Sequence, residues 1–163
     1  MNDTDAELAV QAVREAAYAW QANGFSVVPV QEDGTKRPLG TWKQYQREAA
    51  SRQQVSDWFA SGQRHGLGLI CGAISGGLEM FELEGRAVAE GARNRLVPAL
   101  EGAGIKDLWR RLLQGYCEFT PSGGIHLLYR IADREVPGNT KIARRPATAE
   151  ELATDPDNKV HVL

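Results

Sequence analysis

The sequence has little of what marks secreted or membrane-spanning proteins. Its 163 residues include only two cysteines, Cys71 and Cys117, and they lack a metal-ligand spacing. Two thiols cannot build a disulfide scaffold, so reduced cysteines in a cytoplasm are expected. No stretch approaches the roughly 18 consecutive apolar residues of a membrane span, because glycines interrupt runs such as residues 67–78. We therefore predict no transmembrane helix and no membrane partner.

A strong excess of positive charge is also missing. The formal net charge is −2, which excludes a strongly basic nucleic-acid binder. Residues 130–146 nevertheless hold five bases against two acids, so a local basic surface is possible there. The first nine residues, MNDTDAELA, are acidic where a signal peptide would be positively charged. The predicted location is the cytoplasm.

Apolar periodicity and turn residues predict one domain of mixed helices and strands. A helix is expected up to Asn23-Gly24, because Leu8, Ala12, Ala16 and Trp20 recur at four-residue intervals. Short apolar runs predict strands at 25–30, 67–71, 78–83, 116–120 and 125–131, and helices are expected after Ser51 and at 86–100 and 105–114. The strands at 67–71 and 78–83 are expected to form a hairpin. This order implies an α+β or mixed α/β fold around one central sheet.

Two glutamates at the end of a predicted strand form the first candidate site. Alternation of side chains continued past residue 83 places Glu82 and Glu84 on one face with Leu78 and Met80. Adjacent carboxylates repel unless a cation neutralises them, and oxygen ligands of this kind suit Mg²⁺ or Mn²⁺. The alternative is a solvated polar face at a strand end.

A second candidate is the segment Thr-Pro-Ser-Gly-Gly-Ile-His at residues 120–126. Gly123 and Gly124 permit close backbone approach to a ligand, and Ser122 offers a hydroxyl group. His126 and Arg130 share one strand face, where they could converge on a phosphate. The alternative is a simple hairpin turn with a packed histidine. Because no G-x-S-x-G motif is present, serine hydrolase chemistry has no support.

A third cluster is a basic loop at residues 35–43, TKRPLGTWK. It carries three bases and one aromatic residue, a composition that suits phosphate and base contacts. Lys36 is our candidate in this loop for holding a phosphate group. His65 and His161 stand alone in the sequence and are expected to be surface or structural residues.

Three segments in this order carry a family resemblance. They are K-R-P-x-x-x-W at 36–42, the glycine-rich run ending in E-x-E-G at 68–85, and T-P-S-G-G-I-H-L-L-Y-R at 120–130. With them the chain resembles the N-terminal domain of bifunctional primase-polymerases (prim-pol), in the archaeo-eukaryotic primase superfamily of phages, plasmids and mobile elements. The resemblance covers about residues 15–163.

The resemblance implies a nucleotidyltransferase with an RRM-like sheet flanked by helices. It implies template-directed DNA primase and DNA polymerase chemistry with two divalent cations, a single-stranded DNA template and nucleoside triphosphates. Glu82 and Glu84 would hold the metal, and Ser122 and His126 would contact the nucleotide phosphates. A helicase or other replication module is the expected partner in a full-length protein.

Two departures from the family pattern affect these expectations. The first motif is most often D-x-D, whereas this sequence has E-x-E, whose side chains are longer by one methylene group. The family's third acidic motif follows a strand like Val160–Leu163, so residues 1–163 are expected to be a prim-pol-like domain truncated before that acid. The alternatives are a degenerate or truncated module that binds nucleotide or DNA without turnover, and an unrelated metal-dependent phosphohydrolase.

Overall fold

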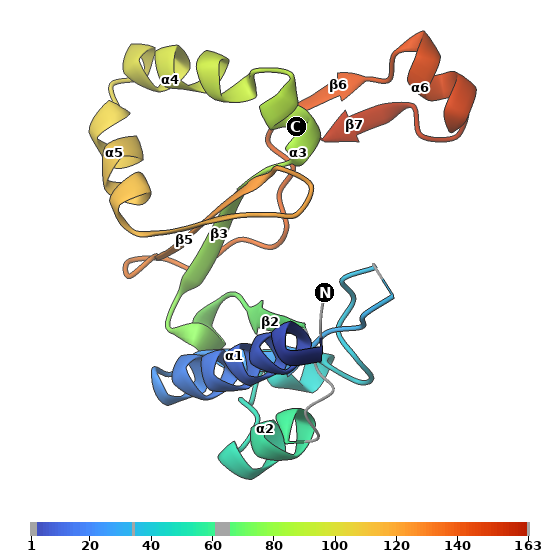
Figure 1. The fold of residues 1–163 in the computed structure, drawn as a ribbon. Coiled ribbons are helices and arrows are strands. Elements are labelled where there is room, and N and C mark those ends of the chain that lie inside the picture. Colours follow the sequence, from blue (N-terminus) through green and yellow to red (C-terminus); the bar gives the residue numbers. More distant parts are fainter. Residues whose placement is uncertain (1–2, 34, 61–65, 163) are drawn as a thin grey trace. The chain divides into compact units, whose positions relative to one another are not determined.

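The computed structural model describes residues 3–33, 35–60 and 66–162, and it divides the chain into two compact units (Figure 1). The first unit comprises residues 1–79 and 130–136, and the second comprises residues 80–129 and 137–163. Helices and small antiparallel sheets make up both units, which confirms the predicted α+β class. His65 lies outside the described residues. Among the described residues, no helix is long and apolar enough to cross a membrane.

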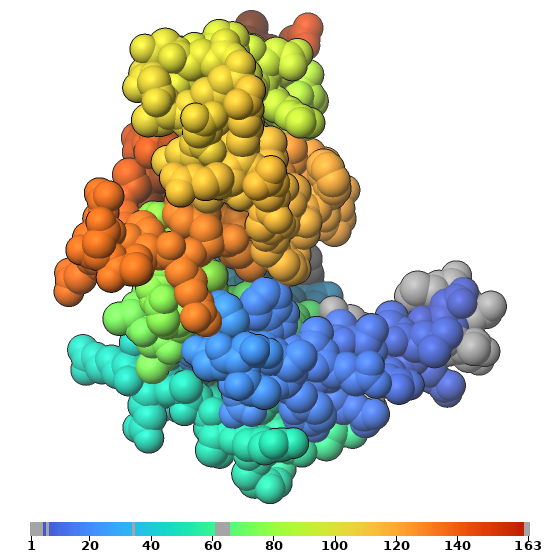
Figure 2. Space-filling view, turned by 90° about the vertical axis from the view of Figure 1, so that its left-hand side faces the viewer, coloured from blue at the N-terminus to red at the C-terminus, as the bar shows by residue number. Residues whose placement is uncertain are grey.

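The first unit is built from a long helix packed on a two-stranded sheet. Its elements are α1 (Asp3–Ala22), β1 (Ser26–Pro29), η1 (Lys43–Gln46), α2 (Arg52–Phe59), β2 (Leu67–Ile70) and η2 (Ala73–Ser75). Strand β1 pairs antiparallel with β2. Figure 2 shows α1 in blue against the cyan segment of α2, and α1 also contacts β1. Ser51 caps α2 by accepting the backbone N–H of Gln54, because the first turn of a helix leaves its donors unpaired.

Two buried serines lie in the core of the first unit. Val55 and Phe59 of α2 pack against the sheet residues Val27 and Val28. Ser26 and Ser75 are fully buried beside them. Ser75 Oγ accepts the backbone N–H of Ser26 at 2.9 Å and donates to the carbonyl of Ile70 at 2.6 Å. These bonds satisfy polar groups that would otherwise be buried without partners.

The predicted hairpin between residues 67–71 and 78–83 is wrong. Strand β2 pairs with β1, whereas β3 (Leu78–Leu83) pairs with β5 (Ile125–Arg130), and only the isolated bridge Gly72–Leu78 links the two segments. Gly77 has a φ of 76°, and a Cβ there would lie 2.2 Å from the carbonyl oxygen of Ile131. The backbone N–H of Ile131 also donates to Gly77. This close approach joins the start of β3 to the end of β5. The predicted single central sheet is three small sheets in the structure.

The second unit holds the remaining elements around a three-stranded sheet. Besides β3 and β5, these are α3 (Gly85–Ala89), α4 (Ala92–Gly102), α5 (Lys106–Gln114), β4 (Tyr116–Phe119), β6 (Arg144–Pro146), α6 (Ala149–Thr154) and β7 (Val160–Val162). The sheet order is β3-β5-β4, with β3 (green) and β5 (orange) side by side in Figure 1. The expected helix at 86–100 is two helices, because Gly91 adopts a left-handed φ of 73°. Pro98 lies inside α4.

One face of β3 and β5 is buried under helices, whereas every residue of β4 is exposed. Leu83, Ile125 and Leu127 pack against Trp109 of α5, with Phe81 at the edge of the cluster. Because side chains alternate along a strand, the residues between them lie on the opposite face. Packing of the core therefore determines which side chains of β3 and β5 face away from the helices and can contact a ligand.

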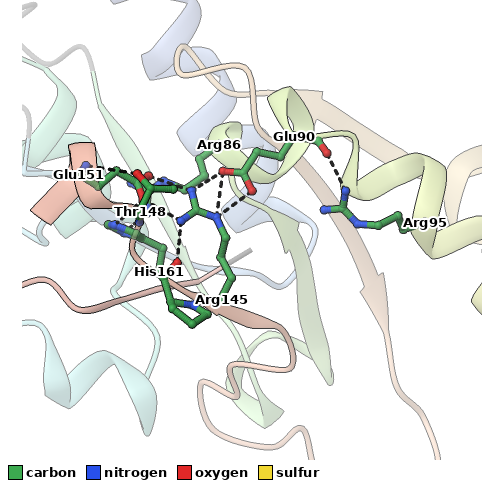
Figure 3. A network of polar contacts seen from close by, with 8 residues as sticks. Arg86, Glu90, Arg95, Arg145, Thr148, Glu151 and His161 are labelled. Carbon is green, nitrogen blue, oxygen red and sulfur yellow. Dashed lines mark hydrogen bonds and ion pairs between the residues drawn. The ribbon is translucent and has the colours of Figure 1, made fainter.

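An arginine clamp, centred on Arg145, connects α3 to α6 and to the paired strands β6 and β7 (Figure 3). Arg145 of β6 donates to both carboxylate oxygens of Glu90, after α3, and to both of Glu151 in α6. Glu151 completes the capping box of α6 with Thr148. His161 of β7 is buried and contacts Arg86 of α3 through Nδ1. These contacts place β7 beside the helix that follows the two candidate metal ligands.

The clamp predicts a pH dependence of stability. Hydrogen bonds from Arg145 hold the pKa values of Glu151 and Glu90 below their ordinary 4.5. A depressed carboxyl pKa stabilises the fold above the unfolded value, and that contribution is lost as the pH falls through the folded value. Arg145→Ala should therefore lower the melting temperature by several degrees at about pH 7. The difference from wild type should shrink toward about pH 3.

The matched control for this prediction is Arg144→Ala, which removes the same charge from the neighbouring, exposed position of β6. Thermal melts of the three proteins across the acid range provide the measurement. A constant difference between wild type and Arg145→Ala at every pH would contradict the prediction.

Candidate active site

A row of three polar side chains crosses the open face of the second unit's sheet. His126 lies in the central strand β5, between Glu82 of β3 and Glu118 of β4. Its Nε2 is 3.1 Å from Glu82 Oε1, and its Nδ1 is 2.8 Å from Glu118 Oε1. The His126 side chain is 18% exposed, against 36% for Glu82 and 45% for Glu118. The structure thus places two sequence-predicted residues in contact and adds a third.

Tyr116 extends this row along β4. Its hydroxyl group donates to Glu118 Oε2 at 2.9 Å, so the two oxygens of Glu118 have different partners. Burial, and then the hydrogen bond to Glu118, raise the pKa of Tyr116 to about 12. The phenol therefore keeps its proton at neutral pH and can orient the carboxylate.

The turn before His126 is ordered by Thr120. The Thr120 hydroxyl accepts the backbone N–H of Gly124 at 2.8 Å and lies 3.0 Å from the Ser122 hydroxyl. Two backbone hydrogen bonds close the same turn, from Gly123 to Thr120 and from Thr120 to Gly124. The exposed Ser122 and Gly123 are therefore held at the tip of a defined loop.

This turn packs directly on the end of the acidic strand. A Cβ on Gly85 would lie 2.0 Å from the carbonyl oxygen of Ser122, and one on Gly124 would lie 2.7 Å from that of Leu83. Only glycine allows two backbones to approach this closely. The E-x-E-G and P-S-G-G segments are distant in sequence, yet their backbones form one structure.

Glu84 directly follows β3 and stands before the first residue of α3. Its side chain is exposed and makes no capping hydrogen bond to that short helix. It is separated from Glu82 by the buried Leu83, which belongs to the core. Two carboxylates therefore flank the point where the strand meets the serine turn.

The family comparison covers most of the chain. The model of the bifunctional DNA primase/polymerase N-terminal family, Prim-Pol, matches residues 16–158, which include both glutamates, the turn and His126. The chain belongs to the Prim-Pol family. Prim-Pol domains are of the primase/polymerase type that transfers nucleotides. No curated protein and no solved structure gave a significant match.

Two other candidate ligands in this Prim-Pol chain have different surroundings. The Arg130 guanidinium stacks 4.5 Å from the centre of the Phe25 ring and donates to the carbonyl of Asn23. Lys36 is exposed at the tip of its loop, with a left-handed φ of 57°. Both belong to the first unit, whereas the polar row belongs to the second. The prediction that Lys36 and Arg130 bind phosphate therefore does not depend on a contact with His126.

The donor set fits a divalent cation that arrives with its substrate. Within the described residues, no three His, Cys, Asp or Glu side chains are arranged to hold a metal ion by themselves. Mg²⁺ in phosphate-transferring sites is usually held by one or two carboxylates together with substrate phosphates and water. Glu82 and Glu84 supply two carboxylates for such a site, and phosphate and water would complete it.

Sequence reasoning missed Glu118 and Thr120. Glu118 could have been found from the hairpin register, because residues 118 and 126 are equally distant from Ser122 at the turn. In an antiparallel pair, residues equidistant from the turn face each other on one side of the sheet. The hydroxyl of Thr120 carried no such signal, because its partner depends on the shape of the turn.

Proposed function

We propose that this chain is the catalytic Prim-Pol domain of a DNA primase/polymerase that acts in phage, plasmid or mobile-element replication. The observation that carries the proposal is the contact of Glu82 with His126, below a serine-glycine turn that packs on the acidic strand. The candidate metal ligand Glu82 and the candidate phosphate donor His126 thus lie on the neighbouring strands β3 and β5. Its substrates are nucleoside triphosphates and a single-stranded DNA template.

The site residues divide between metal binding and phosphate binding. Glu82 and Glu84 would hold Mg²⁺ or Mn²⁺, which would neutralise the charge that develops during phosphoryl transfer. His126 and the Ser122 hydroxyl donate hydrogen bonds to the triphosphate, and the backbones of Gly123 and Gly124 allow the phosphates to approach. Lys36 and Arg130, which belong to the first unit, stay separate predictions as phosphate-binding residues. The chain's own task is to position the triphosphate and stabilise its charge.

A second candidate is a Prim-Pol module that binds nucleotide or DNA without turnover. The E-x-E sequence, in place of the family's usual D-x-D, favours this alternative. It shares the nucleotide site of the first proposal, so binding does not distinguish the two. Only product formation does.

The test is a primer-synthesis and primer-extension assay with the purified chain, single-stranded DNA, ribo- or deoxynucleoside triphosphates, and Mg²⁺ or Mn²⁺. Nucleotide-dependent products that disappear when EDTA removes the metal would support the catalytic proposal. Nucleotide binding without any product, measured by calorimetry on the same preparation, would support the binding module. If the chain neither bound nucleotide nor formed product, both candidates would be rejected.

A further inference from the structure

We infer that Glu118, oriented by Tyr116, is a positioning residue that holds the His126 ring for the nucleotide phosphates. This inference rests on the proposed function for its phosphate ligand but not for its geometry. Glu118 touches neither of the proposed metal ligands in the described contacts. It acts through His126.

The hydrogen bond between Glu118 and His126 determines how the ring is held. Carboxylates accept hydrogen bonds, so the 2.8 Å contact with Glu118 requires a hydrogen atom on Nδ1 of His126, and the 3.1 Å contact with Glu82 requires one on Nε2. The contact with Glu118 also sets the rotation of the ring, which directs Nε2 toward Glu82. Side chains that hold a functional histidine by its second nitrogen commonly orient it in this way.

Tyr116 makes this support more rigid. It donates to Glu118 Oε2 while His126 engages Oε1, so the carboxylate is held at both oxygens. Tyr116 and Glu118 lie on one face of the same strand, and Glu118 is opposite His126 in the register. The hydrogen bond from Tyr116 distinguishes this arrangement from a simple pair formed by Glu118 and His126.

Glu82 cannot provide the same support in the proposed reaction. It also contacts His126, but it is assigned to the metal, so its oxygen has a competing partner. The contact at Nδ1 has no such competitor among the described residues. We therefore expect loss of Glu118 to affect phosphate binding more than overall folding.

The first experiment measures triphosphate affinity for wild type, Glu118→Ala, Glu118→Gln and Tyr116→Phe in the presence of Mn²⁺. Glu118→Ala should weaken binding of a nucleoside triphosphate about tenfold, and Tyr116→Phe should weaken it less. Glu118→Gln keeps an acceptor oxygen and should recover part of the loss. Binding of the nucleoside without phosphates should change less than about twofold in every variant.

Two controls separate positioning from a general structural or charge effect. Asp157→Asn removes a charge from an exposed loop and should leave affinity at the wild-type value. In a His126→Ala background, adding Glu118→Ala should change affinity less than about twofold, because the residue acts through the ring. An equal loss in both backgrounds would overturn the inference.

A second experiment does not depend on the proposed function. Long-range ¹H–¹⁵N spectra of the imidazole groups report which ring nitrogen carries hydrogen, and His126→Ala assigns the signals of His126. At one fixed pH, Glu118→Ala should alter the His126 signals while those of the buried His161 stay unchanged. If wild type binds no triphosphate, the proposed function fails and these spectra alone decide the positioning role. Unchanged His126 signals in folded Glu118→Ala would overturn it.

Discussion

The double variant Glu82→Gln/Glu84→Gln is expected to lose primer extension by about 1,000-fold or more while remaining folded. Glutamine keeps nearly the same shape but removes the negative charges that a divalent cation requires. The cation's stabilisation acts on the charge developed during transfer, so product formation suffers more than binding of the triphosphate. Both side chains are partly exposed, so the exchange leaves no charge buried without a partner.

Extension rates with saturating nucleotide, together with Mn²⁺ titrations in the presence of nucleotide, provide the measurement. The matched control is Glu79→Gln, which removes the same charge from the opposite face of β3. Glu82→Asp/Glu84→Asp tests side-chain length separately, because it keeps both charges and creates the D-x-D pattern. Equal extension and equal Mn²⁺ affinity in wild type and the double glutamine variant would show that these residues hold no metal.

The second large effect is expected from Gly85→Ala, which should destabilise the fold by about 3 kcal/mol. A Cβ at this position would lie 2.0 Å from the carbonyl oxygen of Ser122 and 2.8 Å from its carbonyl carbon. These are backbone atoms, and they cannot move away as the end of a flexible side chain could. The serine turn must therefore separate from the acidic strand, which should also weaken triphosphate binding.

Gly102→Ala is the matched control, because a Cβ there meets nothing within 4 Å. Gly102 ends α4 without a left-handed φ, so alanine should be neutral or slightly stabilising. Urea unfolding of both variants gives the free energies of unfolding, and calorimetry gives the affinity for the nucleotide. Wild-type stability and affinity in Gly85→Ala would show that the turn and the strand do not need this close approach.

The sequence by itself determined the local elements and the family. Short apolar runs located β3, β4 and β5. The four-residue spacing of apolar positions located α1, because burial of one helix face imposes that period. The glutamate pair and the serine-glycine turn were visible as motifs, and the family match confirms the resemblance that they suggested. Their roles as site residues stay predictions.

Only the tertiary structure decided which strands pair and which side chains meet. β3 joins β5 instead of β2 because Gly77 lets the backbone of Ile131 approach, a contact between residues far apart in the chain. Arg130 likewise lies over Phe25, a residue far from it in the chain. A residue's own sequence neighbours set its secondary structure, but the partners of its side chain depend on strand register and backbone approach.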